Sequence, residues 1–424
     1  MYHLYNVLVY LAAPFAILVQ LWRGLRDPSY RDGLGERFGL GPPIPGEIIW
    51  IHAVSVGEVQ AAQPLIAQLR KRHPRYGLLI TTVTPTGAAR AQALFGDQVH
   101  LRYVPLDLPG SVKRFFDRVQ PKLAMILETE LWPNLYGECG RRGIPLVLAS
   151  ARISPRSVGK YRRLVPLFRQ TLSHGIVIAA QSETDAERFR LIGATPSRTH
   201  VTGNIKFDFQ RPEGIEEQGR RWREKHAPGR PIWVAGSTHE GEEAIVLDAH
   251  RRVLEQFPDA LLVLVPRHPQ RFESVRELLS KRHERAAYRS SRMPISPSTS
   301  VLLGDTMGEL MTFYAAADVA LVAGSLVPIG GHNLLEPASV SRPVLTGPHN
   351  FNGEEIAQLL MDAGAAFVVA DAAQLAHAVK GLLGDASLRA VMGAAGRTVL
   401  DANRGALDRL LTLVDPLLEQ RRPA

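Results

Sequence analysis

The sequence Gly-Gly-His-Asn-Leu-Leu-Glu-Pro-Ala at residues 330–338 contains residue types that could hold a nucleotide sugar. The apolar residues 320–323 before it predict a buried strand, and residues 337–340 predict the first turn of a helix. The glycines let the backbone approach a ligand, the helix start offers N–H groups to an anion, and Glu336 could accept hydrogen bonds from sugar hydroxyls. Asn333 and Glu336 also have the spacing of a helix N-cap and its capping-box partner, so both interpretations stand.

Three further turns share this spacing. They begin at Ser55, Ser237 and Thr306 and end at Glu58, Glu240 and Glu309. Each Glu fits a purely structural role as a helix cap, which stabilises a helix start by about 1 kcal/mol. Each turn also follows a predicted strand, and α/β proteins bind ligands at the carboxyl ends of parallel strands. The spacing alone does not separate a cap from a catalytic group.

Three charged residues in the first half of the chain are candidates for catalysis. Glu58 could take a proton from an acceptor hydroxyl. Glu128 and Glu130 follow the predicted strand at residues 123–127, and each would raise the pKa of the other if both faced one cleft. In the alternative, one is a cap or ion-pair partner and the other is solvated; Glu128 is the favoured candidate. Lys206 lies where the first domain leads into the second, so it could meet negative charge there or be solvated.

The motif Pro-Arg-His-Pro at residues 266–269 follows the strongly apolar segment 260–265. Its prolines fix the backbone while Arg267 and His268 project past the strand end, and arginine suits a phosphate. His268 has no partner at metal-ligand spacing, and no Asp-x-Asp pair of a metal-dependent nucleotide-sugar transferase stands out. The sequence therefore predicts no metal and no cofactor, with the leaving-group charge met by Arg267, Lys206 and helix N-termini.

These groups must be positioned by the strands and helices that alternate from residue 47 onward. The pattern predicts two doubly wound, Rossmann-like α/β domains at residues 47–208 and 231–400, joined by a linker at 209–230. Residues 401–424 are expected to form a C-terminal helix. Ligands are expected in the cleft between the two domains.

The first 22 residues contain no Asp, Glu, Lys or Arg, which predicts a membrane-anchor helix. No Lys or Arg precedes this segment, whereas several arginines follow it directly in the juxtamembrane linker at residues 23–46. The positive-inside rule therefore predicts that the remaining chain is cytoplasmic. A buried helix of a soluble domain is the alternative. Pro14 leaves open whether the helix crosses the bilayer or lies in its interface.

Composition narrows the possible partners. The 424 residues are 45% hydrophobic and 21% charged, which indicates a globular chain. The formal net charge of +9 favours an acidic partner such as an anionic lipid or a phosphorylated substrate. Nucleic acid is disfavoured because the basic residues are scattered and no aromatic-basic motif occurs. The single cysteine, Cys139, excludes an intrachain disulfide framework.

Taken together, these motifs resemble those of the 3-deoxy-D-manno-octulosonic acid (Kdo) transferases of lipopolysaccharide biosynthesis. The resemblance covers essentially the whole chain. After the apolar N-terminal segment, it is carried in order by residues 55–58, 128–134, 203–208, 266–269, 307–309 and 330–336.

The resemblance implies a GT-B fold and an inverting transfer of Kdo from CMP-Kdo to the primary hydroxyl of the tetra-acylated lipid A precursor at the cell inner membrane. It implies that the first domain binds the acceptor, that the second binds CMP, and that the C-terminal helix crosses back to the first. Glu58 would be the general base, and Glu128 and Lys206 would stabilise the transition state. The CMP-binding residues would be Pro266, Arg267, His268, Met307, Gly308, Glu309, Asn333, Leu334, Leu335 and Glu336.

Two other functions remain as alternatives. One is a different GT-B enzyme that uses a UDP-sugar, either a lipid glycosyltransferase or an epimerase. The other is a non-catalytic protein that binds anionic lipid; such a protein would tolerate loss of the Glu58 carboxylate.

Overall fold

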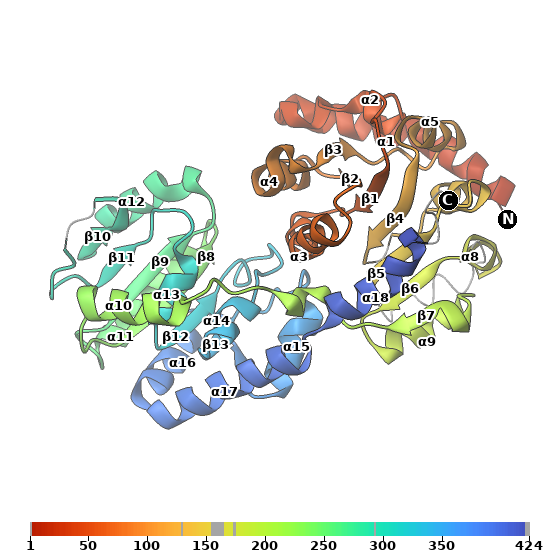
Figure 1. The fold of residues 1–424 in the computed structure, drawn as a ribbon. Coiled ribbons are helices and arrows are strands. Elements are labelled where there is room, and N and C mark those ends of the chain that lie inside the picture. Colours follow the sequence, from red (N-terminus) through yellow and green to blue (C-terminus); the bar gives the residue numbers. More distant parts are fainter. Residues whose placement is uncertain (1, 129, 154–164, 173–174, 292–293, 420–424) are drawn as a thin grey trace. The chain divides into compact units, whose positions relative to one another are not determined.

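The computed structural model describes the chain except for residues 1, 129, 154–164, 173–174, 292–293 and 420–424. The chain divides into unit 1, residues 1–209 and 403–424, and unit 2, residues 210–402 (Figure 1). Each unit contains a parallel seven-stranded sheet with helices packed against it. The predicted α/β class with two Rossmann-like domains is therefore confirmed.

The sheet of unit 1 has the strand order β3-β2-β1-β4-β5-β6-β7, so the direction of winding reverses between β1 and β4. In such sheets the reversal opens a crevice at the carboxyl ends of the strands, where ligands bind. The strands are β1 Ile48–His52, β2 Gly77–Thr82, β3 His100–Tyr103, β4 Pro121–Leu127, β5 Leu146–Ala151, β6 Val177–Ala180 and β7 Thr199–Val201.

The central strands of unit 1 are apolar along their whole length because helices cover both faces of the sheet. All five residues of β1 are buried, and its odd and even positions contribute to separate hydrophobic clusters. The helices of unit 1 are α1 Tyr2–Arg26, α2 Leu34–Arg37, α3 Val56–Arg72, α4 Pro85–Phe95, α5 Pro109–Val119, α6 Pro133–Arg141, α8 Val165–Leu172, α9 Glu183–Leu191 and α18 Ala406–Glu419.

The C-terminal helix α18 packs into unit 1. Its apolar residues Leu410, Leu411 and Val414 are buried in the cluster that contains the inner side chains of β1 and β4. The carboxylate of Asp208 accepts hydrogen bonds from the N–H groups of Gly405 (2.7 Å) and Leu407 (2.6 Å). The helix start is thereby fixed to the segment that follows β7.

The sheet of unit 2 has the order β10-β11-β9-β8-β12-β13-β14 and reverses between β8 and β12. Its strands are β8 Ile232–Thr238, β9 Leu261–Pro266, β10 Ala286–Tyr288, β11 Val301–Leu303, β12 Val319–Val322, β13 Val344–Thr346 and β14 Ala366–Val368. Its helices are α10 Ile215–His226, α11 Glu242–Leu254, α12 Phe272–Lys281, α13 Leu310–Ala316, α14 Leu335–Ser339, α15 Glu354–Asp362, α16 Ala372–Gly384 and α17 Ala386–Ala402.

The segment expected as a linker at residues 209–230 contains a helix, α10, which belongs to unit 2. The ring of its Trp222 packs edge-on against Phe313 of α13, with 5.5 Å between centroids. Gly219 lies so close to α13 that an added Cβ would be 2.5 Å from the Ala315 Cβ. The sequence of α10 is mostly polar and charged, and only one narrow face of the helix is apolar. Its composition therefore does not indicate this contact.

Helix α1 is long and apolar enough to cross a membrane, and almost none of it is buried. Its first turns contact unit 1 directly. The Tyr2 hydroxyl donates to the Pro133 carbonyl (2.9 Å), the Tyr5 hydroxyl donates to Asp107 (2.7 Å), and the Asn6 side chain accepts from Asn134 (2.8 Å). The start of α1 is therefore fixed to the N-terminal end of α6.

Candidate active site

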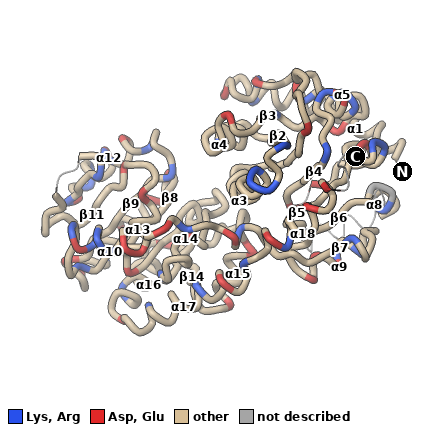
Figure 2. Tube along the Cα trace, viewed as in Figure 1, with Lys and Arg blue, Asp and Glu red and all other residues tan. Residues whose placement is uncertain are grey.

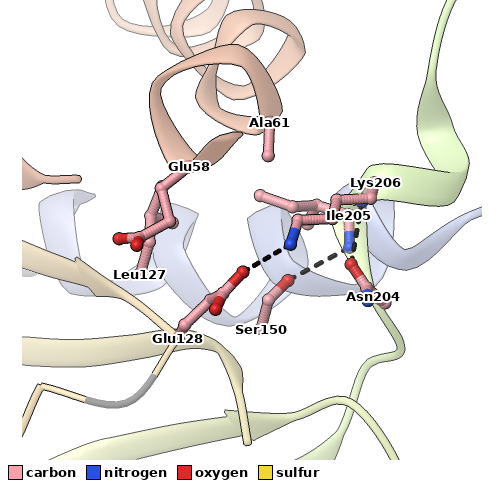
Figure 3. A pocket seen from close by; sticks show the side chains of 8 residues that line it. All are labelled: Glu58, Ala61, Leu127, Glu128, Ser150, Asn204, Ile205 and Lys206. Carbon is pink, nitrogen blue, oxygen red and sulfur yellow. Dashed lines mark hydrogen bonds and ion pairs between the residues drawn. The ribbon is translucent and has the colours of Figure 1, made fainter. Parts of the chain in front are cut away.

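A small pocket lies at the carboxyl ends of β1, β4 and β5 in unit 1 (Figure 3). It is the end of the sheet where the strand order reverses. The fold therefore brings together Glu58, Glu128 and Lys206, which are far apart in the sequence. The residues that line the pocket are Glu58, Ala61, Leu127, Glu128, Ser150, Asn204, Ile205 and Lys206.

Glu58 lies in the first turn of α3 and forms a capping arrangement with Ser55, the N-cap residue. The Glu58 N–H donates to the Ser55 hydroxyl (3.4 Å), which in turn donates to the Glu58 carboxylate (3.1 Å). The Val54 N–H donates to the other carboxylate oxygen (2.8 Å). Both carboxylate oxygens are thus held in place, and the capping interpretation of this turn is correct.

The environment of the same carboxylate raises its affinity for a proton. The pKa of Glu58 is raised from 4.5 to about 7, mainly by burial and next by the negative charge of Glu128, and the hydrogen bonds from Val54 and Ser55 oppose this rise. Only 9% of the residue is exposed. A base with a pKa near the working pH transfers protons most effectively, so this environment suits proton abstraction.

Glu128 and Lys206 form an ion pair across the pocket, with 2.6 Å between Lys206 Nζ and the Glu128 carboxylate. Glu128 has a left-handed backbone (φ 58°), which is strained for a residue with a Cβ. Such strain is frequent at functional sites, because the surrounding structure must impose it. The lysine predicted to meet negative charge or solvent meets this carboxylate.

Glu130 has a different environment from Glu128. Its carboxylate accepts a hydrogen bond from the Trp132 indole, and it does not line the pocket. Burial raises the pKa of Glu130, and the charge of Glu128 adds to the effect. The geometry therefore keeps Glu128, the favoured carboxylate of the pair, next to Lys206.

Three polar residues that were not predicted from the sequence as site residues support this site, namely Ser150, Asn204 and Gln181. Ser150, with φ 50°, accepts a hydrogen bond from the Ile205 N–H through its hydroxyl (3.1 Å). Asn204 accepts from the Lys206 N–H (3.0 Å) and donates its amide to Gln181 (3.2 Å). They hold the short 3-10 turn that presents Lys206. The only sequence signal was the Gly-Asn pair at residues 203–204, which is typical of a turn.

In unit 2, the residues predicted to hold CMP lie in three loops at the carboxyl ends of strands. Pro266 ends β9, and the Arg267 N–H donates to the Thr238 carbonyl at the end of β8 (3.0 Å). Arg267 is half-buried and His268 is exposed. Among the described residues, the Arg267 guanidinium has no ion-pair partner, so its charge is available to a ligand.

The second loop contains Met307, Gly308 and Glu309. Met307 is 61% exposed, and Gly308 has a left-handed φ of 85° with open space around it. The Glu309 carboxylate accepts from the Arg289 guanidinium (2.7 Å) and from the Thr306 hydroxyl. Helix α13 begins only at Leu310, so Glu309 is not the N3 cap that the spacing from Thr306 suggested.

In the third loop, α14 begins at Leu335 and is five residues long. The Asn333 side chain accepts from the Leu335 N–H (3.1 Å), and its contact with Glu336 is long (3.5 Å). The N-cap residue is Leu334. A capping box between Asn333 and Glu336 is therefore not formed.

The turn from Ser237 to Glu240 also differs from a capping box. Glu240 is exposed and pairs with Arg271 (3.4 Å). The carboxylate that accepts the His239 N–H (2.9 Å) belongs to Glu242, which is completely buried at the start of α11. The helix begins at Glu242 with Gly241 (φ 92°) as its N-cap residue, which is four residues later than an N-cap at Ser237 would place it.

Comparisons with known proteins agree with the resemblance seen in the motifs. The family model described as 3-Deoxy-D-manno-octulosonic-acid transferase (kdotransferase) matches residues 32–209. The 3-deoxy-D-manno-octulosonic acid transferase of Haemophilus influenzae is 43% identical over 422 residues, which is 98% of each chain. That of Bordetella pertussis is 38% identical over 396 residues, or 90% of each chain.

Among solved structures, the UDP-GlcNAc 2-epimerase of Neisseria meningitidis is similar in fold. It superposes with a TM-score of 0.55 at 15% identity, covering 88% of this chain and 100% of that one. At this identity the likeness concerns the arrangement of the strands and helices alone.

Proposed function

Because the chain belongs to the 3-deoxy-D-manno-octulosonic acid (Kdo) transferase family, it is a glycosyltransferase that transfers Kdo, and we propose that it moves Kdo from CMP-Kdo to the primary hydroxyl of a tetra-acylated lipid A precursor. The observation that carries this proposal is the pocket of unit 1, where a carboxylate with a pKa of about 7 lies beside a carboxylate–lysine ion pair.

In the proposed reaction, Glu58 accepts the proton of the acceptor hydroxyl as that oxygen attacks the anomeric carbon of Kdo. The bond between this carbon and the phosphate oxygen breaks, and CMP leaves with the electron pair. The attack occurs opposite to the leaving group, so the configuration inverts. The hydrogen bonds from Val54 and Ser55 fix the direction of the Glu58 carboxylate, which makes proton transfer directional.

The ion pair of Glu128 and Lys206 has a separate role in this proposal. Lys206 supplies positive charge to the anionic sugar, whose carboxylate adjoins the reacting carbon. Glu128 holds the ammonium in place and keeps it from pairing with Glu58. Preorganised charges of this kind stabilise a transition state more than the ground state.

The donor nucleotide is assigned to unit 2, at Pro266, Arg267, His268, residues 307–309 and residues 333–336. The supporting observations are the Arg267 guanidinium at the end of β9, which has no ion-pair partner among the residues that the structure describes, and the open backbone at Gly308. Since Arg289 neutralises the Glu309 carboxylate, the backbone of that loop is the part that faces the nucleotide.

We also propose that α1 anchors the enzyme in the interface of the inner membrane and does not cross the bilayer. Leu4, Leu8, Leu11, Phe15 and Leu18 recur every three or four residues along one face and are all more than half exposed. A helix that crossed the bilayer would move Tyr2 and Tyr5 away from their partners in unit 1 by about 30 Å. We further propose that the catalytic units lie on the cytoplasmic side, beside the anionic acceptor.

Lys and Arg are distributed over many elements of both units (Figure 2). Scattered positive charges fit local attraction to anionic groups, whereas a nucleic-acid-binding protein would have a continuous basic stripe on its surface.

The decisive experiment measures transfer from freshly generated CMP-Kdo to the tetra-acylated lipid A precursor in the presence of EDTA, with the product identified by mass. Wild type should add Kdo, whereas Glu58→Gln should lose activity by orders of magnitude and still bind CMP. No product from intact donor and folded enzyme would reject CMP-Kdo as the donor. Protection against heat by UDP and not by CMP would favour the UDP-sugar alternative.

A further inference from the structure

Three histidines in unit 2 meet at the carboxyl ends of the central strands. His239 follows β8, His268 follows β9, and His332 lies in the loop after β12. The Nε2 atoms of His239 and His332 are 2.9 Å apart, and their rings are stacked with 10° between the planes. His268 packs its ring edge-on against His239, with 5.3 Å between centroids. His239 and His332 were not among the predicted nucleotide-binding residues.

The two loops that carry His239 and His332 are held by one buried carboxylate. Glu242, which has no exposed surface, accepts the N–H of His239 (2.9 Å) and the N–H groups of residues 324–326 (2.8, 3.1 and 2.9 Å). The Gly331 N–H donates to the Gly324 carbonyl (2.8 Å), and a Cβ at Gly324 would lie 2.7 Å from the His332 ring. The backbone therefore sets the contact between the two rings.

The charges around the pair favour an anion. Arg271 is paired with Glu243 (3.0 Å) and Glu240 (3.4 Å), and the Glu242 carboxylate is occupied by backbone N–H groups. Arg267, whose charge lowers the pKa of His332, has no ion-pair partner in the described part of the chain. The positive charge of Arg267 is therefore available to an anion at this cluster.

Burial and nearby positive charge favour the neutral form of both rings. Burial, followed by the charges of His268 and Arg267, lowers the pKa of His239 to about 4. Burial, followed by Arg267, lowers the pKa of His332 to about 3. Burial and the charges of Arg267 and Arg271 also lower the pKa of His268.

The contact between the two Nε2 atoms fixes the tautomers as a complementary pair. One ring must donate an Nε2–H and the other must accept it, because a neutral imidazole carries a single proton. The accepting ring then carries Nδ1–H, and the donating ring has an unprotonated Nδ1. The pair therefore offers an anion one hydrogen-bond donor and one basic nitrogen.

We propose that His239, His332 and Arg267 bind the phosphate of the donor nucleotide, and that the histidine pair takes up a proton from solvent as the phosphate binds. The proposal rests on the proposed function for the identity of the nucleotide. The anion compensates the positive charge of Arg267, which together with burial keeps the pair neutral, so the free Nδ1 becomes protonated and both rings donate hydrogen bonds. As the bond between Kdo and phosphate breaks, the phosphate gains charge, and the protonated pair stabilises it.

The test is calorimetric titration of the full-length enzyme with CMP at about pH 7.5, in two buffers that differ in ionisation enthalpy. The difference between the buffers gives the number of protons exchanged. Wild type should take up close to one proton more per CMP than His332→Gln, whose amide replaces Nε2 but cannot be protonated. The variant should also bind CMP about ten-fold or more weakly. His377→Gln, at an exposed position on α16, should match wild type.

The outcomes separate this inference from the proposed function. Equal proton uptake by wild type and His332→Gln would overturn the inference even if CMP binds. Equal proton uptake on titration with free Kdo would assign the cluster to a carboxylate and overturn the phosphate site. If CMP does not bind but inorganic phosphate binds with proton uptake, the anion site stands and the CMP donor is wrong. Binding of neither would reject the phosphate site, while the transfer assay decides the reaction independently.

Discussion

Replacing Glu58 by Gln should make unit 1 more stable above neutral pH while it removes activity. The folded state holds the Glu58 pKa near 7, whereas the ordinary value is 4.5. The folded state therefore binds more protons than the unfolded state between these values, and its stability falls as the pH rises from 4.5 to 7. At about 1.4 kcal/mol per pH unit, the full destabilisation is about 3 kcal/mol above pH 7.

Glutamine is a suitable replacement because it keeps the hydrogen bonds of the cap. Its carbonyl can accept from the Val54 N–H, and its amide can donate to the Ser55 hydroxyl. What it removes is the buried negative charge and the repulsion from Glu128. The variant should thus recover most of the 3 kcal/mol at high pH and little at low pH.

The assay is thermal unfolding of the full chain in detergent at about pH 8.5 and about pH 5, followed at the transition of unit 1. Glu58→Gln should raise the Tm by about 5 °C or more at the higher pH and change it little at the lower one. A variant that is less stable than wild type by the same amount at both pH values would refute the reasoning. It would mean that Glu58 is mainly a cap and that ionisation of its carboxylate does not destabilise the folded state.

Three other predictions follow from the same contacts. In wild type, kcat/KM should fall about ten-fold per pH unit below about pH 7, because Glu58 must be ionised to accept a proton; a flat profile from pH 5 to 8 would exclude it as the base. Glu128→Gly should be more stable than Glu128→Ala by about 1 kcal/mol, because both lose the ion pair and only glycine relieves the left-handed φ of 58°; chemical denaturation measures the difference. Replacing Leu11 and Phe15 of α1 by Glu should release the enzyme from anionic vesicles without lowering its Tm, because both are 72% exposed; continued flotation with vesicles would argue against the anchor.

The alternation of strands and helices and the two-domain class could be predicted from the sequence because the central strands are short apolar runs between turn residues. The edge strands β10 and β14 were missed, since each has three residues and none of those in β10 is fully buried. Helix α10 was taken for a linker because its mean composition is polar, and its apolar contact with α13 involves Gly219 and Trp222. Local composition does not report a contact that is made by one narrow face.

The residues that line the pocket were predictable only where their type suggests chemistry. Glu58, Glu128 and Lys206 stood out as charges at strand ends, and the fold brings them together. Ser150 and Asn204 were not identified, because their importance comes from a left-handed backbone and from hydrogen bonds to residues distant in sequence. His239 and His332 were missed for the same reason: their contact links loops after two different strands.

The recurring Ser/Thr/Asn-x-x-Glu spacing posed a choice between helix cap and functional group, and the proposed role of Glu58 as a base is compatible with its role as a cap. There the capping hydrogen bonds hold the carboxylate, while burial raises its pKa to about 7. At Glu240 and Glu309 the predicted box does not form, and each carboxylate pairs with an arginine. The spacing therefore identifies where a strand ends and a helix begins, which in a parallel sheet is the edge that binds ligands. Which carboxylate acts there is decided by burial and by neighbouring charge, because these set the proton affinity on which the chemistry depends.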